Sequence, residues 1–276
     1  MAQALGERIG CSTLSYHMLP FEAALSRIRA RGLRLVDIAA IAGLCEHAPP
    51  LGMRSADRVR WAQTVHSMGL EVMSLNVGHG PFNVEDGLEE RKQYVRSSLD
   101  LAGLVRASVV TIPTGRRVAP GDWLDHAKRV SRTVREFIPQ AVDAGVTLSV
   151  EAPHVNSLCS TVNEAVRFLE LVGDGRLTLT FDTSHVHVGG DLMRNAVGKM
   201  GPWLGHVHLR DCRGRDTAVT PGDGDLSFRD LFSALSGRRY EGGIAVELLT
   251  PDATPDIVDR EVIRALTHLR GVLGGG

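Results

Sequence analysis

The 276-residue sequence has few cysteines, almost no net charge and no long apolar run. A formal net charge of −1 gives no reason to expect nucleic acid or an anionic membrane as a partner, and it favours a small-molecule substrate. The cysteines form no CxxC or CxxH pattern, which argues against a thiolate zinc site and a disulfide framework and suits a reducing cytoplasm. They are Cys11, Cys45, Cys159 and Cys212.

Several other signals are also missing. No run approaches the roughly 18 apolar residues that span a bilayer, and the first ten residues, MAQALGERIG, have no apolar core of a signal peptide. We therefore expect a soluble, cytoplasmic protein. No GxGxxG follows the first predicted strand, which argues against a dinucleotide-binding sheet. No linker or break in composition divides the chain, so we expect a single domain over residues 1–276.

The sequence instead alternates between β-rich runs and amphipathic helical segments. Eight such units favour an α/β protein of the (β/α)8 TIM-barrel class, for which about 250 residues is a usual length; an open doubly wound sheet is the alternative. Pro139 is expected to kink or split the helix in which it lies. The predicted strands are 9–15, 33–38, 71–76, 108–112, 146–151, 177–181, 204–209 and 244–248. The predicted helices are 21–30, 55–69, 88–104, 123–144, 162–172, 195–200, 228–235 and 258–272.

Four consecutive predicted strands end on side chains that bind metals or transfer protons. Glu151, Asp182, His208 and Glu247 would meet at one rim, because the carboxyl ends of barrel strands lie together. Three carboxylates and an imidazole in a partly buried site repel one another unless a cation holds them. The sequence therefore predicts one divalent ion, with Mn²⁺, Mg²⁺ or Co²⁺ expected and Zn²⁺ or Fe²⁺ left open.

Histidines near two of these strand ends extend the predicted site. In the stretch LTLTFDTSHVHVGG, His185 follows Asp182 by three residues and can converge on the same volume, although Asp182 is equally suited to cap a helix. His206 and His208 face the same side of their strand. His208 is nearer the carboxyl end and is the expected ligand, whereas His206 is expected to support it or to pack in the core.

Two further residues are candidates for contact with a substrate. His79, in the loop GHGPFN, lies at the same predicted rim and could line the pocket or bond to its own loop backbone. Arg210, Arg213 and Arg215 could bind a carboxylate or phosphate, and Arg213 is the one we expect to do so; the alternative is a solvated surface residue.

Five motifs in the C-terminal half resemble the xylose isomerase-like TIM-barrel superfamily. This is the sugar phosphate isomerase/epimerase group, which also contains endonuclease IV. The N-terminal half matches only in its alternation of strands and helices. The motifs are LSVEAPH at 148–154, FDTSH at 181–185, HVHLRD at 206–211, PGDGDLSF at 221–228 and GGIAVELL at 242–249.

The resemblance implies a ligand set and a reaction. Glu151, Asp182, His208 and Glu247 would bind one divalent cation, and His185 would contact the substrate or assist proton transfer. Glu151 and Glu247 would act as acid and base beside a carbonyl, with the metal stabilising an enediolate. We therefore predict an isomerase or epimerase of a small polyhydroxylated carbonyl compound, such as a sugar or cyclitol, that forms a homodimer or homotetramer.

Some departures from the family pattern limit how much of the family's chemistry can be expected of this chain. Residues 152–159 hold no carboxylate, which weakens a free-sugar 3-epimerase; His154 is the candidate substrate contact there. The extra histidine ligands of endonuclease IV are missing at 111–115 and 213–224. An inosose or 3-dehydroshikimate dehydratase, with His154 or His185 as acid, is the alternative enzyme. A non-catalytic sugar-binding or accessory subunit is the alternative from another class.

Overall fold

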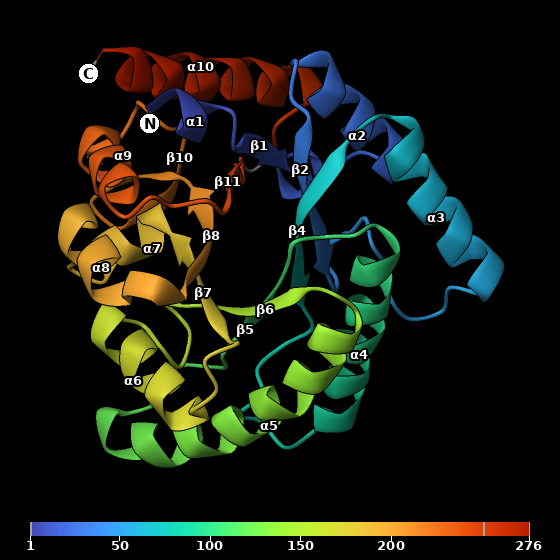
Figure 1. Ribbon diagram of the computed structural model, residues 1–276, viewed down its shortest axis with the longest axis vertical. Coiled ribbons are helices and arrows are strands. Elements are labelled where there is room, and N and C mark those ends of the chain that lie inside the picture. Colours follow the sequence, from blue (N-terminus) through green and yellow to red (C-terminus); the bar gives the residue numbers. More distant parts are fainter. Residues whose placement is uncertain (1, 251, 276) are drawn as a thin grey trace.

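A computed structural model describes residues 2–250 and 252–275. Eight parallel strands form a closed barrel with helices around it, which confirms the predicted (β/α)8 class (Figure 1). Pairing of β1 with both β11 and β2 closes the sheet. In their order around the barrel the strands are β1 (Ile9–Ser12), β11 (Gly243–Val246), β8 (Leu204–Leu209), β7 (Thr178–Asp182), β6 (Thr147–Glu151), β5 (Val109–Pro113), β4 (Glu71–Gly78) and β2 (Leu35–Ile41).

The outer helices bury one apolar face each against this barrel. In α5 the buried residues include Val130, Val134 and Phe137, which recur every three or four positions. The helices are α2 (Phe21–Ala30), α3 (Ser55–Ser67), α4 (Leu88–Leu104), α5 (Trp123–Asp143), α6 (Val162–Val172), α8 (Met193–Met200), α9 (Phe228–Gly237) and α10 (Pro255–Gly274).

One long helix differs from its prediction. Helix α5 runs through Pro139 without being split. Proline removes one backbone hydrogen bond from a helix interior, but Ile138 and Ala141 on either side of it are buried, and this packing holds the helical turn in place.

Several short elements were not predicted. The most important are α7 (Thr183–Val188), which begins directly after β7, and the antiparallel ribbon of β9 (Asp211–Arg213) and β10 (Asp216–Val219), which follows β8. The others are α1 (Ala2–Gly6), β3 (Cys45–Glu46) and the 3-10 turns 13–16, 120–122 and 201–203. In Figure 1 α1 lies beside α10.

The interior of the barrel contains a layer of buried hydroxyl groups. Thr180 Oγ1 lies 2.8 Å from both Thr111 Oγ1 and Ser149 Oγ, and Ser74 Oγ lies 3.4 Å from Thr111 Oγ1. These groups satisfy one another, so the polar interior costs little. Among the described residues no helix is both long enough and apolar enough to cross a bilayer.

Candidate metal centre

Strand register brings the four predicted ligands to one rim. Asp182, the last residue of β7, is paired with His208 on β8, and His208 is paired in turn with Ala245 on β11. Glu247 follows Ala245 by two residues, which puts it on the same side of the sheet. Glu151 is the last residue of β6, the strand next to β7.

The side chains of these residues approach to within a few ångströms. His208 Nδ1 lies 3.3 Å from Glu151 Oε1 and 3.7 Å from Glu247 Oε2. One ligand atom each from Asp182, His208 and Glu247 lie within 4.8 Å of one another. Asp182 and His208 are fully buried and Glu247 is 3% exposed, so these three are shielded from bulk water, whereas the Glu151 side chain is 17% exposed.

The two oxygens of Asp182 have separate roles. Oδ1 accepts hydrogen bonds from Ser184 N at 2.8 Å, Ser184 Oγ at 2.6 Å and His185 N at 3.1 Å, and so caps helix α7. Oδ2 is buried without a hydrogen-bond partner and is the oxygen that remains for a ligand. The helix cap and the site residue, which were alternatives in the sequence, are compatible in the structure.

The residues fit a divalent cation. A buried carboxylate oxygen without a partner costs free energy that a bound cation would recover. Three carboxylates and one imidazole form a mostly oxygen donor set, which suits Mn²⁺ or Mg²⁺, while the imidazole also allows Co²⁺, Zn²⁺ or Fe²⁺.

Crowding of like charges perturbs the ionisation of the cluster. Burial raises the pKa of Glu247 to about 7, although the charges of His208 and Arg210 oppose this shift. Burial also acts to raise the pKa of Glu151, but the hydrogen bond from His208 and the charge of His154 outweigh it and lower the value to about 2. Burial lowers the pKa of His208, yet Glu247, Asp37 and Glu151 together raise it well above its usual value. The carboxylates therefore favour a positive charge among them, which a bound cation would supply.

Two side chains outside the predicted ligand set hold the Glu247 carboxylate. Asn76 Nδ2, on β4, donates to Oε2 at 3.2 Å, and Arg210 Nη1 lies 3.5 Å from Oε1. Arg210 Nη1 also lies 3.8 Å from Asp182 Oδ2. The sequence interpretation missed Asn76, for which the only signal was a polar residue near the end of an apolar strand.

Asp37 and His206 lie behind His208. Asp37 is the one acidic residue in the apolar β2 strand LVDIAAI and is fully buried, as is His206. Asp37 Oδ2 lies 3.3 Å from His206 Nε2 and 3.6 Å from His208 Nε2. Asp37 was also missed in the sequence, although a lone carboxylate in a strand of this kind was a usable signal.

Of the other predicted site residues, His185 and His154 lie beside the cluster, whereas His79 and Arg213 contact groups outside it. His185 on α7 is 4% exposed, shares a ligand-sized cluster with Glu151 and Asp182, and its ring centroid lies 3.8 Å from that of His154. His79 packs on the ring of Tyr94, with its Nε2 3.8 Å from Glu90 Oε1. Arg213 is exposed and donates to the carbonyl oxygen of Asp223. The guanidinium that reaches the cluster is therefore that of Arg210.

A cleft of about 400 Å³ opens over Glu151. Its lining includes His154, Asn156, Arg116 and Gly80, all from loops after barrel strands, and its volume suits a small molecule. A larger hollow of about 790 Å³ lies at the opposite end, next to the first residues of β1 and β2. Of the three clusters able to hold an ion that the described residues form, none includes a residue lining it, and that end of a TIM barrel usually serves stability.

Comparison with known proteins places this site in a wider context. The family described as xylose isomerase-like TIM barrel matches residues 25–269. A D-psicose 3-epimerase of Enterocloster bolteae is 26% identical over 232 residues, which are 72% of this chain and 75% of that protein. A fructoselysine 3-epimerase of Escherichia coli O157:H7 is 25% identical over 255 residues, which are 88% of this chain and 90% of that protein.

A different reaction appears among relatives that match over a shorter stretch. An inosose dehydratase of Clostridium perfringens is 26% identical over 112 residues, which are 34% of this chain and 38% of that protein. Among solved structures, a D-psicose 3-epimerase crystallised in the presence of D-fructose superposes with a TM-score of 0.81 over 97% of this chain and all of that one. Its sequence identity of 18% makes this a likeness of fold.

Proposed function

Because the chain belongs to the xylose isomerase-like TIM barrel family, we propose that it is a divalent-metal-dependent epimerase or isomerase of a small polyhydroxylated carbonyl compound. The observation that carries the proposal is the cluster of three carboxylates and one imidazole, with the buried Asp182 Oδ2 left without a partner. The two epimerases matched by sequence, from Enterocloster bolteae and Escherichia coli, cover most of the chain, whereas the dehydratase matches about a third of it.

In the proposed site Glu151, Asp182, His208 and Glu247 hold the ion. A bound divalent ion would polarise the substrate carbonyl and so acidify the neighbouring C–H group. We propose Mn²⁺, Mg²⁺ or Co²⁺ for this role, since oxygen donors outnumber nitrogen three to one.

Glu151 and Glu247 are proposed to move the proton. One carboxylate removes the proton from the carbon next to the carbonyl, and the other returns a proton to the opposite face, so the substrate changes configuration without net loss of atoms. Asn76 and Arg210 support this role for Glu247, because a donor close to each oxygen fixes the direction in which the carboxylate points. His185, beside Asp182, and His154, in the cleft, are proposed to contact substrate hydroxyl groups.

The second candidate function is a dehydratase. It shares the first proton removal but then expels a hydroxyl group, which needs an acid beside the leaving oxygen. The His154–His185 pair favours this candidate, because its two rings lie next to each other at the site. The inosose dehydratase among the relatives supports it as well.

Proton exchange tests both candidates in one experiment. The metal-loaded protein is incubated in D₂O with ketohexoses, ketopentoses, inososes and 3-dehydroshikimate. An epimerase incorporates deuterium next to the carbonyl and yields an isomer of unchanged composition, whereas a dehydratase yields a product that has lost water. Glu151→Gln and Glu247→Gln, which keep the size of each side chain, are expected to lower exchange by at least about 100-fold.

Absence of exchange with every substrate class, in protein that holds its metal, would contradict a catalytic role and leave the accessory or sugar-binding role.

We also propose a cytoplasmic location. The four cysteines are all buried and free, which supports it. A homodimer or homotetramer stays part of the proposal.

A further inference from the structure

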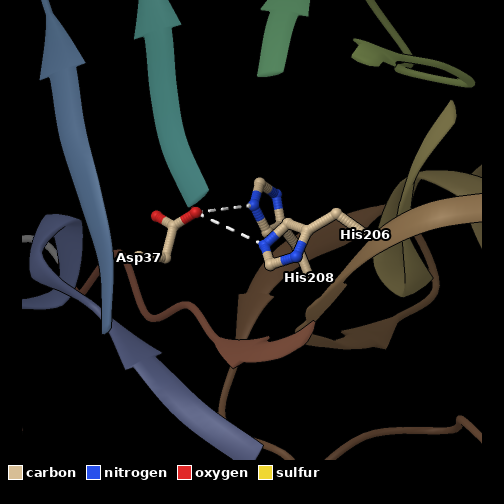
Figure 2. Close-up of side chains that lie close together, drawn as sticks. All are labelled: Asp37, His206 and His208. Atoms are coloured by element: carbon tan, nitrogen blue, oxygen red, sulfur yellow. Dashed lines mark ion pairs between the residues drawn. The ribbon is translucent and has the colours of Figure 1, made fainter. Parts of the chain in front are cut away.

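Asp37 reaches the candidate metal centre from across the barrel. It lies on β2, while His206 and His208 lie on β8, and strands β1 and β11 separate β2 from β8 in the sheet. Figure 2 shows one oxygen of Asp37 facing a nitrogen of each imidazole ring. Asp37 Oδ2 lies 3.3 Å from His206 Nε2 and 3.6 Å from His208 Nε2. The contact is therefore a link through the interior between strands that are not neighbours.

The other oxygen of Asp37 is already engaged. Ser12 Oγ donates to Asp37 Oδ1 at 2.7 Å, which leaves Oδ2 as the oxygen free to accept from the histidines. Asp37, His206 and His208 are all fully buried. Oδ2 and the Nε2 atoms of both rings are each buried without a hydrogen bond of normal geometry. The two N–H groups, at 3.3 and 3.6 Å, are therefore the nearest donors with which this buried carboxylate can form ion pairs.

The two nitrogens of His208 face different groups. Nε2 is directed at Asp37, whereas Nδ1 lies 3.3 Å from Glu151 Oε1 and 3.7 Å from Glu247 Oε2. A neutral imidazole carries a proton on only one of its nitrogens. The hydrogen bond from Nδ1 to Glu151 Oε1 puts a proton on Nδ1 where no ion is bound. If a cation takes the place of that proton, Asp37 keeps the proton on Nε2 and Nδ1 presents its lone pair to the ion.

We infer that Asp37 is a positioning residue, which holds His208 with Nε2 protonated and Nδ1 turned to the cation. This inference rests on the proposed function, since it presupposes a metal at the four-ligand site. Carboxylates that accept the second N–H of a metal-bound histidine fix its ring orientation and make it a better donor.

A separate cation among Asp37, His206 and His208 is a poorer interpretation of the same residues. Their ligand atoms also lie within 4.8 Å of one another. They supply only one carboxylate, however, and one of its oxygens already accepts from Ser12. The neighbouring site offers three carboxylates to a divalent ion, so the ion is held there and Asp37 acts through His208.

The test compares Asp37→Asn with two control variants by titration with Mn²⁺ and Co²⁺. Asparagine keeps the size of the side chain and loses its charge, so we expect the Kd for each ion to rise roughly 10- to 100-fold. Ser74→Ala is the control for loss of a buried polar group, since Ser74 is the register partner of Asp37 on β4 and bonds to Thr111 instead. His206→Asn is the control for the other ring, and a smaller rise in Kd is expected because Asp37 keeps His208.

Two further readouts, rescue by metal and the protonation of His208, separate positioning from a merely structural role. Turnover of Asp37→Asn is expected to recover toward the wild-type kcat when Mn²⁺ is raised above the weakened Kd. Nitrogen-15 NMR of the Mg²⁺-loaded wild-type protein is expected to show His208 protonated at Nε2. The wild-type spectrum decides the assignment even where a variant does not fold.

Unchanged Mn²⁺ and Co²⁺ affinity in folded Asp37→Asn, or His208 protonated at Nδ1 in the Mg²⁺-loaded wild-type protein, overturns the inference. A melting temperature of the metal-free variant below that of Ser74→Ala, with unchanged Kd, overturns it as well by assigning Asp37 a structural role alone. Failure of the proposed function looks different, because the wild-type protein would then bind none of the three ions, or would hold its metal without catalysing proton exchange.

Discussion

At the scale of single residues, the position of each arginine relative to strand β8 decides which of them reaches the cluster. The sequence offered Arg210, Arg213 and Arg215 close behind His208, and Arg213 was the predicted substrate contact. In the structure Arg210, two residues after His208 and so on the same side, points at Glu247 and Asp182. Its side chain is 11% exposed and its Nη1 lies within 4 Å of both carboxylates, so its charge acts directly on the cluster.

The two arginines give a matched pair of variants. Arg210→Met is expected to lower kcat/KM roughly 10- to 100-fold, because a charged hydrogen-bonding group is worth about 1.5–3 kcal/mol at a buried site. Arg213→Met is expected to stay within about twofold of wild type, since Arg213 is exposed and its guanidinium bonds to the backbone of the 221–225 turn. Steady-state kinetics on the substrate identified by exchange measures both. A larger effect at Arg213 than at Arg210 would return the role to the residue first predicted.

At the scale of elements, one carboxylate organises the loop that follows β8. Asp211 Oδ2 accepts from Gly222 N at 2.9 Å and Gly224 N at 3.0 Å, while Oδ1 accepts from Leu226 N at 3.1 Å and Cys212 N at 2.8 Å. Gly224 is required there, because a Cβ at this position would lie 2.3 Å from Asp211 Oδ1. The motif PGDGDLSF thus has a structural purpose, which is to wrap its backbone around Asp211.

Removal of this carboxylate is expected to destabilise the protein. Asp211→Ala leaves four backbone N–H groups without their acceptor, which should lower the free energy of unfolding by about 2–4 kcal/mol. Asp216→Ala is the control, because Asp216 is exposed and accepts from Ala218 N in the same ribbon. Urea denaturation followed by circular dichroism compares the two variants. Equal stability of Asp211→Ala and Asp216→Ala would mean that the loop does not depend on Asp211.

The elements that the sequence predicted well are those with strong local patterns. Helices 21–30, 88–104 and 162–172 begin and end where the structure has them, because their apolar periodicity and end signals agree. The β9–β10 ribbon was missed, and helix α7 was anticipated only as the alternative in which Asp182 caps a helix. Both elements are short and also depend on contacts at the barrel rim that no local pattern encodes, such as the bond of Thr183 Oγ1 to the carbonyl oxygen of Arg210.

At the scale of the whole molecule, closure of the barrel creates the site. The four predicted ligands could be found in the sequence because each stands at or next to a strand end, and parallel strands bring those ends together. Asp37 could not be found in this way. It lies within β2 and reaches His208 through the barrel interior, a relation that follows only from closure of the sheet. Site residues at strand ends are thus predictable from order along the chain, whereas a lone carboxylate within a strand can be noticed in the sequence but its partner across the barrel cannot.

The most direct test of the metal centre is the metal content of the purified protein. Elemental analysis compares the metal content of the wild-type protein with that of Glu151→Gln and Asp182→Asn. The control is Ser149→Ala, which removes one hydroxyl group from the buried layer inside the barrel. We predict about one Mn, Mg, Co, Fe or Zn per chain in the wild type and the control, and at least a tenfold loss in both ligand variants. A wild-type protein that holds no metal after incubation with each of these ions would contradict the account.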